Sequence, residues 1–204
     1  TYICVKVMER IIQKQLLQFL NTHSVIPINQ HGFLSKITVV TCLLQCLNIW
    51  TSHLDKSEPV DVVYLDFEKA FDRVPHRRLS LKIEHAGVKG LLLEWIKAIL
   101  SNRTFSVKVG TSYSDTQYVL SGVPQGSVLG PILFLIYIAD LQVGLKSRNA
   151  FYADDGKIFC NLLTASVSLQ ENLDFICAWT TLWLSPLNTN KCSVFRLGNK
   201  NPRV

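Results

Sequence analysis

The sequence predicts an α+β fold, because segments with helical periodicity and segments typical of strands are mixed without a regular strand–helix–strand alternation. Hydrophobic residues make up 48% of the 204 residues, which is enough to bury a sizeable core. Charged residues make up only 18%, and the formal net charge is +6. A mild positive excess of this kind fits a nucleic-acid partner, but it does not identify one by itself.

Two helices and a strand are predicted in the first third of the chain. Residues 5–20 place apolar side chains three and four positions apart, which is typical of an amphipathic helix. Residues 38–54 show a second helical pattern, whose first residue is a threonine suited to N-capping. Residues 60–67 form an apolar run with the composition of a buried strand. We expect a short helix to follow from Glu68.

The middle of the chain predicts two further helices and a pair of strands. Residues 77–86 and 90–100 have helical patterns, and Gly87 fits the C-terminal cap of the first. Residues 105–109 and 117–120 are rich in β-forming side chains, and a loop joins them.

The most apolar run of the chain lies at residues 128–139. It is shorter than the roughly 20 residues that cross a bilayer, so we predict a buried core helix. Residues 149–153 and 156–161 predict a hairpin, residues 164–183 an amphipathic helix, and residues 194–197 a last strand.

The cysteines and the first residues of the chain bear on its compartment. None of the six cysteines forms a Cys-x-x-Cys pair, and several lie in apolar runs where a free thiol behaves as a small hydrophobe. The first residues mix charged and apolar side chains and do not resemble a signal peptide. We expect an intracellular protein of the cytoplasm or nucleus, not secreted, without a membrane partner, and a piece of something longer.

Three carboxylates stand out against the apolar segments that carry them. Asp66 ends a predicted strand, and Asp154 and Asp155 lie at the predicted hairpin tip. If the strands are neighbours, the acids converge, and two unit charges about 4 Å apart repel by roughly 4 kcal/mol at a dielectric constant of 20. Divalent cations such as Mg²⁺ compensate such a cluster. Each motif alone also fits a plain turn or helix cap.

A glycine-rich turn precedes the predicted core helix. Gly122 and Gly126 remove side-chain bulk where backbone could approach a ligand, and Pro124 stiffens the turn. Gln125 offers an amide that both donates and accepts hydrogen bonds. A tight turn before a helix would have the same composition.

Taken together, three segments carry a specific resemblance. They occur in the order Leu65-Asp-Phe-Glu-Lys-Ala-Phe-Asp72, Ser121-Gly-Val-Pro-Gln-Gly-Ser-Val-Leu-Gly-Pro131 and Tyr152-Ala-Asp-Asp155. They resemble motifs A, B and C of the reverse transcriptases of Jockey-like, non-LTR retrotransposons. The resemblance extends to His31-Gly-Phe33 and Asn190-Lys-Cys192 and covers nearly the whole chain.

The resemblance implies a right-hand polymerase fold of fingers and palm, with an antiparallel palm sheet backed by helices. Residues 1–59 would form a fingers-type helical region. Residues 60–204 would form the palm with inserted fingers helices, carrying motifs A to D, and the thumb would be absent. An unrelated metal-dependent phosphoesterase is a rival, but the Pro-Gln-Gly turn argues against it.

The resemblance also implies roles for individual residues. Asp66, Asp154 and Asp155 would hold two Mg²⁺ ions, with Mn²⁺ as the alternative, and Lys191 would protonate the leaving pyrophosphate. Phe71 would exclude a ribose 2′-hydroxyl. A core aromatic and a solvated lysine are the alternatives for Phe71 and Lys191. The remaining substrate contacts would be Phe67, Gln125, Gly126 and Lys36, and the structural residues would be Gly122, Pro124 and Tyr152.

The function implied is RNA-directed DNA polymerisation, with an RNA template, a DNA primer and deoxynucleoside triphosphates as partners. The alternative is a catalytically inactive nucleic-acid-binding relic of such an enzyme. Leu34 and Ile37 stand where the family carries arginines, and Lys36 compensates only in part, which favours the relic.

Other polar and aromatic residues are predicted to be ordinary. The acids read as caps or surface groups are Asp61, Asp72 and Asp140. The histidines have no metal-ligand spacing and are read as surface or loop residues: His23, His31, His53, His76 and His85. Trp179 and Trp183, four positions apart, are read as core.

Overall fold

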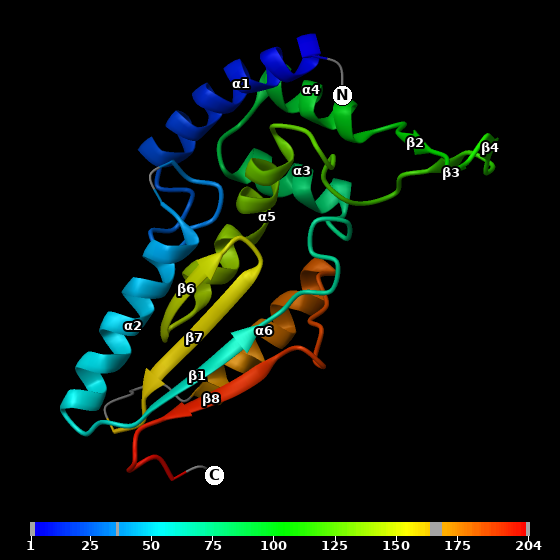
Figure 1. Ribbon diagram of the computed structural model, residues 1–204. Helices are drawn as coiled ribbons and strands as arrows, with labels where there is room; N and C mark the ends of the chain where they lie inside the picture. Colours follow the sequence, from blue (N-terminus) through cyan, green and yellow to red (C-terminus); the bar gives the residue numbers. More distant parts are fainter. Residues whose placement is uncertain (1–2, 36, 164–168, 203–204) are drawn as a thin grey trace. The chain divides into compact units, whose positions relative to one another are not determined.

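The computed structural model describes residues 3–35, 37–163 and 169–202, and the chain forms two compact units. The helical unit comprises residues 1–25 and 69–137, and the sheet unit comprises residues 26–68 and 138–204. Figure 1 shows the elements of both units. The predicted assignment of residues 1–59 to fingers and 60–204 to palm stays a prediction.

Three predicted helices are confirmed in the helical unit. They are α1 (Ile3–Thr22), α3 (His76–His85) and α4 (Gly90–Leu100). Each buries one stripe of side chains, as Leu16 and Leu20 of α1 show, because apolar residues recur at helical spacing. Gly87 follows α3 with a φ of +94°, as its predicted capping role requires.

Of the two strands predicted after α4, the one over 105–109 is broken in two, and the one over 117–120 is shortened to residues 117–118, while a further short strand lies at 112–113 in the predicted loop. β2 (Thr104–Phe105) pairs with β5 (Gln117–Tyr118), and β3 (Lys108–Val109) pairs with β4 (Ser112–Tyr113). Between the pairs, the amide of Val107 donates to the Ser114 hydroxyl at 2.9 Å instead of continuing a ladder. The four short strands form an exposed arm, drawn at the side of Figure 1.

The predicted core helix is confirmed as α5 (Gly130–Gly144). Every residue from 132 to 138 is buried, which explains why this segment is apolar all round rather than on one stripe. The chain passes from the helical unit into the sheet unit within α5. Among the described residues, no helix is both long enough and apolar enough to span a membrane.

The sheet unit is built on four antiparallel strands in the order β6 (Arg148–Tyr152), β7 (Asp155–Asn161), β1 (Val60–Leu65) and β8 (Ser193–Leu197). α2 (Val39–Asp55) covers one face, and α6 (Leu169–Trp183) lies on the other (Figure 1). The face under α2 is a cluster of Cys42, Cys46, Trp50, Val60, Val62, Ala150 and Phe159. The predicted cap of α2 is confirmed as a capping box between Thr38 and Thr41.

The short helix predicted from Glu68 is wrong. Residues 68–72 form turns, and Lys69 adopts a φ of +49°, in a region that no helix interior uses. The amide of Glu68 donates to the carbonyl of Pro186 at 2.9 Å, so a distant segment holds the chain in a non-helical path. The helix predicted over 164–183 is confirmed from Leu169, and residues 164–168 lie outside the described residues.

Candidate active site

The predicted acidic hairpin forms between β6 and β7 in the sheet unit. Its two-residue loop consists of Ala153 and Asp154, and Asp155 begins β7 opposite Tyr152. Ala153 has a φ of +56°, which is uncommon for a residue with a Cβ. Asp154 is half-buried and Asp155 is exposed, so the two adjacent carboxylates have different surroundings.

Asp66 directly follows β1, the strand next to β7 in the sheet. The register pairs Leu65 with Gly156, so Asp66 comes beside Asp155 at the same end of the sheet. The main chain of Asp66 is held by the segment before β8. The amide of Asn188 donates to the Asp66 carbonyl at 2.8 Å, and the Asp66 amide donates to Cys192 Sγ at 3.5 Å.

Lys191 is brought to the same place by that segment. Its Nζ lies 3.7 Å from Asp66 Oδ2, and its side chain is 67% exposed. A solvated ion pair of this length contributes little to stability, about 0–1 kcal/mol. The side chain therefore keeps the freedom to move towards another anion near Asp66.

The surroundings of Asp154 disfavour the charged form of its carboxyl group. Burial raises the pKa of Asp154 above its usual range, and the charges of Asp155 and Asp66 raise it further, against a backbone hydrogen bond that lowers it. Two carboxylates thus act on the third through space, as neighbouring strand ends require. A cation placed among them would relieve the repulsion.

The donor set fits a hard divalent cation, because all three candidate ligands are carboxylates. Among the described residues, no group of three or more His, Cys, Asp or Glu side chains is already arranged around one point. Mg²⁺ is commonly bound through one or two carboxylates, with water and phosphate oxygens completing its shell. The acids therefore suit an ion that arrives together with a phosphate-bearing ligand.

Two other residues predicted to belong to the site, Phe67 and Tyr152, make packing and strand-pairing contacts beside the acids. Phe67 is 5% exposed, and its ring packs edge-on against Trp179 at 6.3 Å between centroids. That burial gives Phe67 a packing role beneath Asp66. Tyr152 ends β6 and pairs across the hairpin with Asp155, as a structural residue of the tip would.

The other predicted substrate residues lie in the helical unit. Phe71 stacks on Phe134, with ring centroids 4.3 Å apart and planes 22° apart. A cavity of about 260 Å³ borders this ring and the glycine-rich turn; its lining is Phe71, Val123, Pro124, Gln125, Gly126, Ser127, Gly130 and Pro131. The predicted gate and turn thus share one hollow.

Asp72 holds the glycine-rich turn in place through hydrogen bonds. Gln125 Nε2 donates to Asp72 Oδ1 at 2.7 Å, and the hydroxyl of Ser121 donates to the Asp72 carbonyl at 2.8 Å. Gly122 has a φ of +92°, and a Cβ there would lie 2.8 Å from the Asp72 carbonyl oxygen. Only glycine fits this position. The turn is closed by the Ser127 hydroxyl, which donates to the Pro124 carbonyl at 2.7 Å.

Two residues near the hairpin tip were missed by sequence reasoning. Gln30 is 1% exposed, and its side-chain amide bonds both Gly32 and Ala153. His31, predicted to be a surface or loop residue, lies in a loop but is only 5% exposed, and among the described residues neither of its ring nitrogens has a hydrogen-bond partner. Burial, aided by the charge of Lys157, lowers the pKa of His31. The motif His31-Gly-Phe33 was the one sequence signal that pointed to this segment. The predicted contact residue Lys36 lies outside the described residues.

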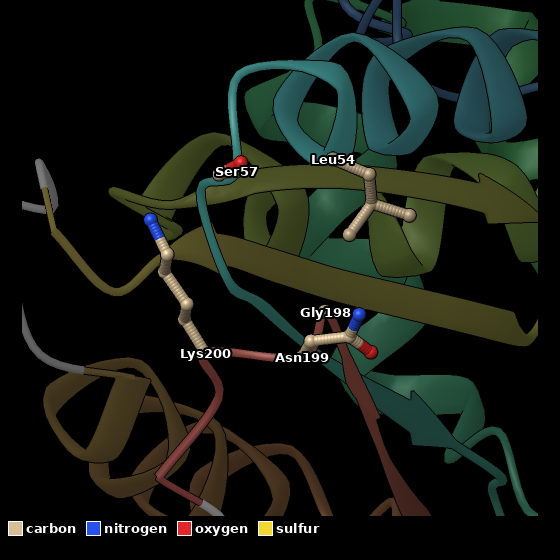
Figure 2. A pocket seen from close by; sticks show the side chains of 5 residues that line it. All are labelled: Leu54, Ser57, Gly198, Asn199 and Lys200. Carbon is tan, nitrogen blue, oxygen red and sulfur yellow. The ribbon is translucent and has the colours of Figure 1, made fainter.

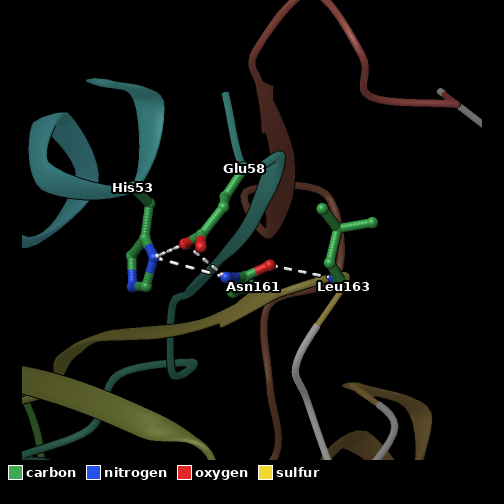
Figure 3. Close-up of polar contacts among 4 residues, drawn as sticks. All are labelled: His53, Glu58, Asn161 and Leu163. Carbon is green, nitrogen blue, oxygen red and sulfur yellow. Dashed lines mark hydrogen bonds and ion pairs between the residues drawn. The ribbon is translucent and has the colours of Figure 1, made fainter. Parts of the chain in front are cut away.

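At the opposite end of the sheet, His53, Glu58 and Asn161 form a group of polar contacts. Asn161, the last residue of β7, donates to Glu58 Oε2 at 2.7 Å and accepts from the Leu163 amide at 2.9 Å (Figure 3). His53 Nδ1 lies 2.6 Å from the same Glu58 oxygen, which ties the end of α2 to β7.

A cavity of about 420 Å³ lies at the junction of α2 and β8, lined by Leu54, Ser57, Gly198, Asn199 and Lys200 (Figure 2). The described residues that line this cavity include none with a predicted functional role.

The chain matches one known family over almost its whole length. Residues 2–202 match the family described as "Reverse transcriptase (RNA-dependent DNA polymerase)". The RNA-directed DNA polymerase from mobile element jockey of Drosophila melanogaster is 32% identical over 206 residues, which is 96% of this chain and 22% of that protein. The probable RNA-directed DNA polymerase from transposon BS of the same species is 33% identical over 91% of this chain. The chain thus spans about a fifth of these relatives.

Solved structures support the fold. The telomerase of Candida tropicalis, solved in complex with a fragment of telomeric RNA, superposes with a TM-score of 0.70 at 15% identity, over 92% of this chain and 34% of that one. The apo form of the same telomerase gives a TM-score of 0.71 at 13% identity over 94% of this chain and 37% of that one. At these identities the likeness shows the arrangement of helices and antiparallel sheet alone, and it agrees with the predicted polymerase fold.

Proposed function

Since this chain belongs to the reverse transcriptase family, we propose that its acids carry out RNA-directed DNA polymerisation. One observation carries the proposal. Strand register places Asp66 beside the hairpin that bears Asp154 and Asp155. Three acids on adjacent strand ends suit phosphoryl transfer, which depends on positioning and charge compensation more than on a protein nucleophile.

The residues that would hold divalent ions are Asp66, Asp154 and Asp155. Two Mg²⁺ ions bound there would supply charge neutralisation and a clamp on the attacking and leaving oxygens. The chain itself contributes the placement of the carboxylates: the Asp66 backbone is fixed by Asn188, and the hairpin fixes Asp154. Lys191 would hold a proton near Asp66 for the departing pyrophosphate, from its position 3.7 Å from that carboxylate.

The substrates would be an RNA template, a DNA primer and deoxynucleoside triphosphates. Support comes from the cavity beside Phe71 and from the exposed Gln125 amide at its rim. Phe71 is braced by Phe134, so its ring would resist displacement by a ribose hydroxyl. The chain's net charge of +6 favours contact with a nucleic-acid backbone.

A primer-extension assay tests the function. The wild-type chain is given a primed RNA template, the four deoxynucleotides and Mg²⁺, and it should extend the primer. Asp154→Asn should abolish extension while template binding persists. The matched control is Asp55→Asn, at the exposed end of α2, and it should extend normally.

The inactive relic makes a different prediction in the same assay. Leu34 and Ile37 in place of the family's arginines favour it. A relic would bind the template without extending the primer, and its template affinity would not respond to Asp154→Asn. That result would overturn the enzymatic proposal.

A further inference from the structure

A segment from outside the sheet runs along the strand that leads into the acidic hairpin. The amide of Phe151 donates to the Asn29 carbonyl at 2.9 Å, and the His31 amide donates to the Phe151 carbonyl at 2.7 Å. Gln30 and Phe151 therefore form a parallel bridge. Because β6 is an edge strand, residues 29–31 satisfy backbone groups there that the sheet leaves open.

The side chain of Gln30 continues from that bridge to the hairpin tip. Its Oε1 accepts from the amides of Gly32 and Ala153, both at 2.8 Å, and its Nε2 donates to the Ala153 carbonyl at 3.3 Å. One amide thus bonds both polar backbone groups of Ala153. At 1% exposure, Gln30 makes these bonds where water does not compete for them.

Ala153 requires such support. Its φ of +56° is disfavoured for a residue with a Cβ, by about 1–2 kcal/mol. A two-residue hairpin loop usually places glycine or asparagine at positive φ. Gly32 permits the approach, since a Cβ there would lie 2.4 Å from the Ala153 nitrogen. The segment at 30–32 therefore forms a clamp on the loop residue that precedes Asp154.

We propose that Gln30 is a positioning residue of the acidic hairpin: its amide locks Ala153 in the left-handed conformation and so sets the direction of Asp154. The proposal rests on the proposed function of the acids. Gln30 is buried, and within the described residues its side chain bonds backbone groups alone. It acts through the backbone, so its loss should loosen the tip and weaken ion binding without dismantling the sheet.

The experiment uses the 204-residue chain with Mn²⁺ as the probe, followed by electron paramagnetic resonance, and amide hydrogen exchange as a readout independent of activity. Gln30→Met removes the amide at nearly constant volume. Gln142→Met is the matched control, because Gln142 is 3% exposed and neither of its side-chain polar atoms has a hydrogen-bond partner in the part of the chain that the structure describes. Should Gln30→Met fail to fold, Gln30→Asn keeps the amide but is too short to reach both Gly32 and Ala153.

We expect exchange of the Gly32 and Ala153 amides to become about tenfold faster in the Gln30 variant. Mn²⁺ affinity should fall about tenfold, the usual effect of losing a supporting partner behind a ligand. The control should change neither. Unchanged exchange, or faster exchange with unchanged Mn²⁺ affinity, would overturn the proposal. A wild-type chain that binds no Mn²⁺ would instead overturn the proposed function of the acids.

Discussion

Replacing Gly32 by alanine tests the clamp from its other side. The added Cβ would lie 2.4 Å from the Ala153 nitrogen, 2.9 Å from its Cα and 3.0 Å from its Cβ. Two of these three atoms are backbone, and rotation of a side chain cannot move them aside. The substitution therefore forces the Ala153 loop and the segment at residue 32 apart.

The size of the effect follows from those distances. An ordinary contact between heavy atoms is about 3.5 Å, so the nearest pair must separate by about 1 Å. A separation of that size breaks the bonds that Gln30 makes to Gly32 and Ala153. Overpacking of buried sites costs about 1–3 kcal/mol. In a chain of this length, that corresponds to a fall in the unfolding temperature of about 2–12 °C.

Thermal unfolding followed by circular dichroism measures the loss, and hydrogen exchange over residues 150–156 locates it. Gly90→Ala is the control, because a Cβ at Gly90 meets nothing within 4 Å. The control should lose only the cost of a Cβ at positive φ, about 1–2 kcal/mol, and leave the hairpin amides unchanged. If Gly32→Ala unfolds at the wild-type temperature with normal hairpin exchange, the close approach of the two segments is refuted.

Three further outcomes are expected. Glu9→Ala should destabilise the chain by about 1–3 kcal/mol in urea unfolding, because Glu9 is 3% exposed and accepts from the Val128 amide at 2.7 Å; exposed Glu94→Ala should not, and equal effects would contradict the reasoning. Because burial raises the pKa of Asp154 above 3.8 in the folded chain, stability is lost as the pH rises through that pKa. Asp154→Asn should therefore raise the unfolding temperature at pH 7 but not at pH 3, and a less stable variant at pH 7 would count against the assignment. Phe71→Val should admit ribonucleotides in the extension assay, and unchanged sugar selectivity in an active protein would refute the gate.

Helices with strong local signals could be predicted from the sequence. Residues 5–20 carry their own apolar stripe, and α1 extends that range by only two residues at each end. α2 begins where the sequence places a capping threonine, Thr38, because the cap bonds lie within three residues of each other. Signals of this kind need no information from elsewhere in the chain.

Features that depend on distant segments could not be predicted. Glu68, Lys69 and Ala70 are all good helix formers, yet a backbone bond from Glu68 to Pro186 decides the path of the chain there. His31 was predicted to be a surface or loop residue; it lies in a loop, but the bond from its amide to the Phe151 carbonyl holds it in the interior.

In the candidate site, too, residues with a local sequence signal could be predicted, and residues that act through distant contacts could not. Adjacent carboxylates inside an apolar run are unusual enough that Asp154 and Asp155 could be picked out from the sequence alone. Gln30 could not, because the loop residue it bonds is 123 positions away. Asp72 was predicted to be a cap or surface group, and its bond to Gln125 across 53 residues became visible only in the folded chain.

The order of strands has a practical consequence for handling this chain. Among the described residues, β8 pairs with β1 on one side only, and Val194 and Phe195 on it are half exposed. An edge strand of this kind can pair with any extended peptide, including one from a second molecule of the same chain. Arg196 is the sole charge among its five residues to discourage that growth. A lysine introduced at position 194 would be a rational first step towards well-behaved concentrated samples.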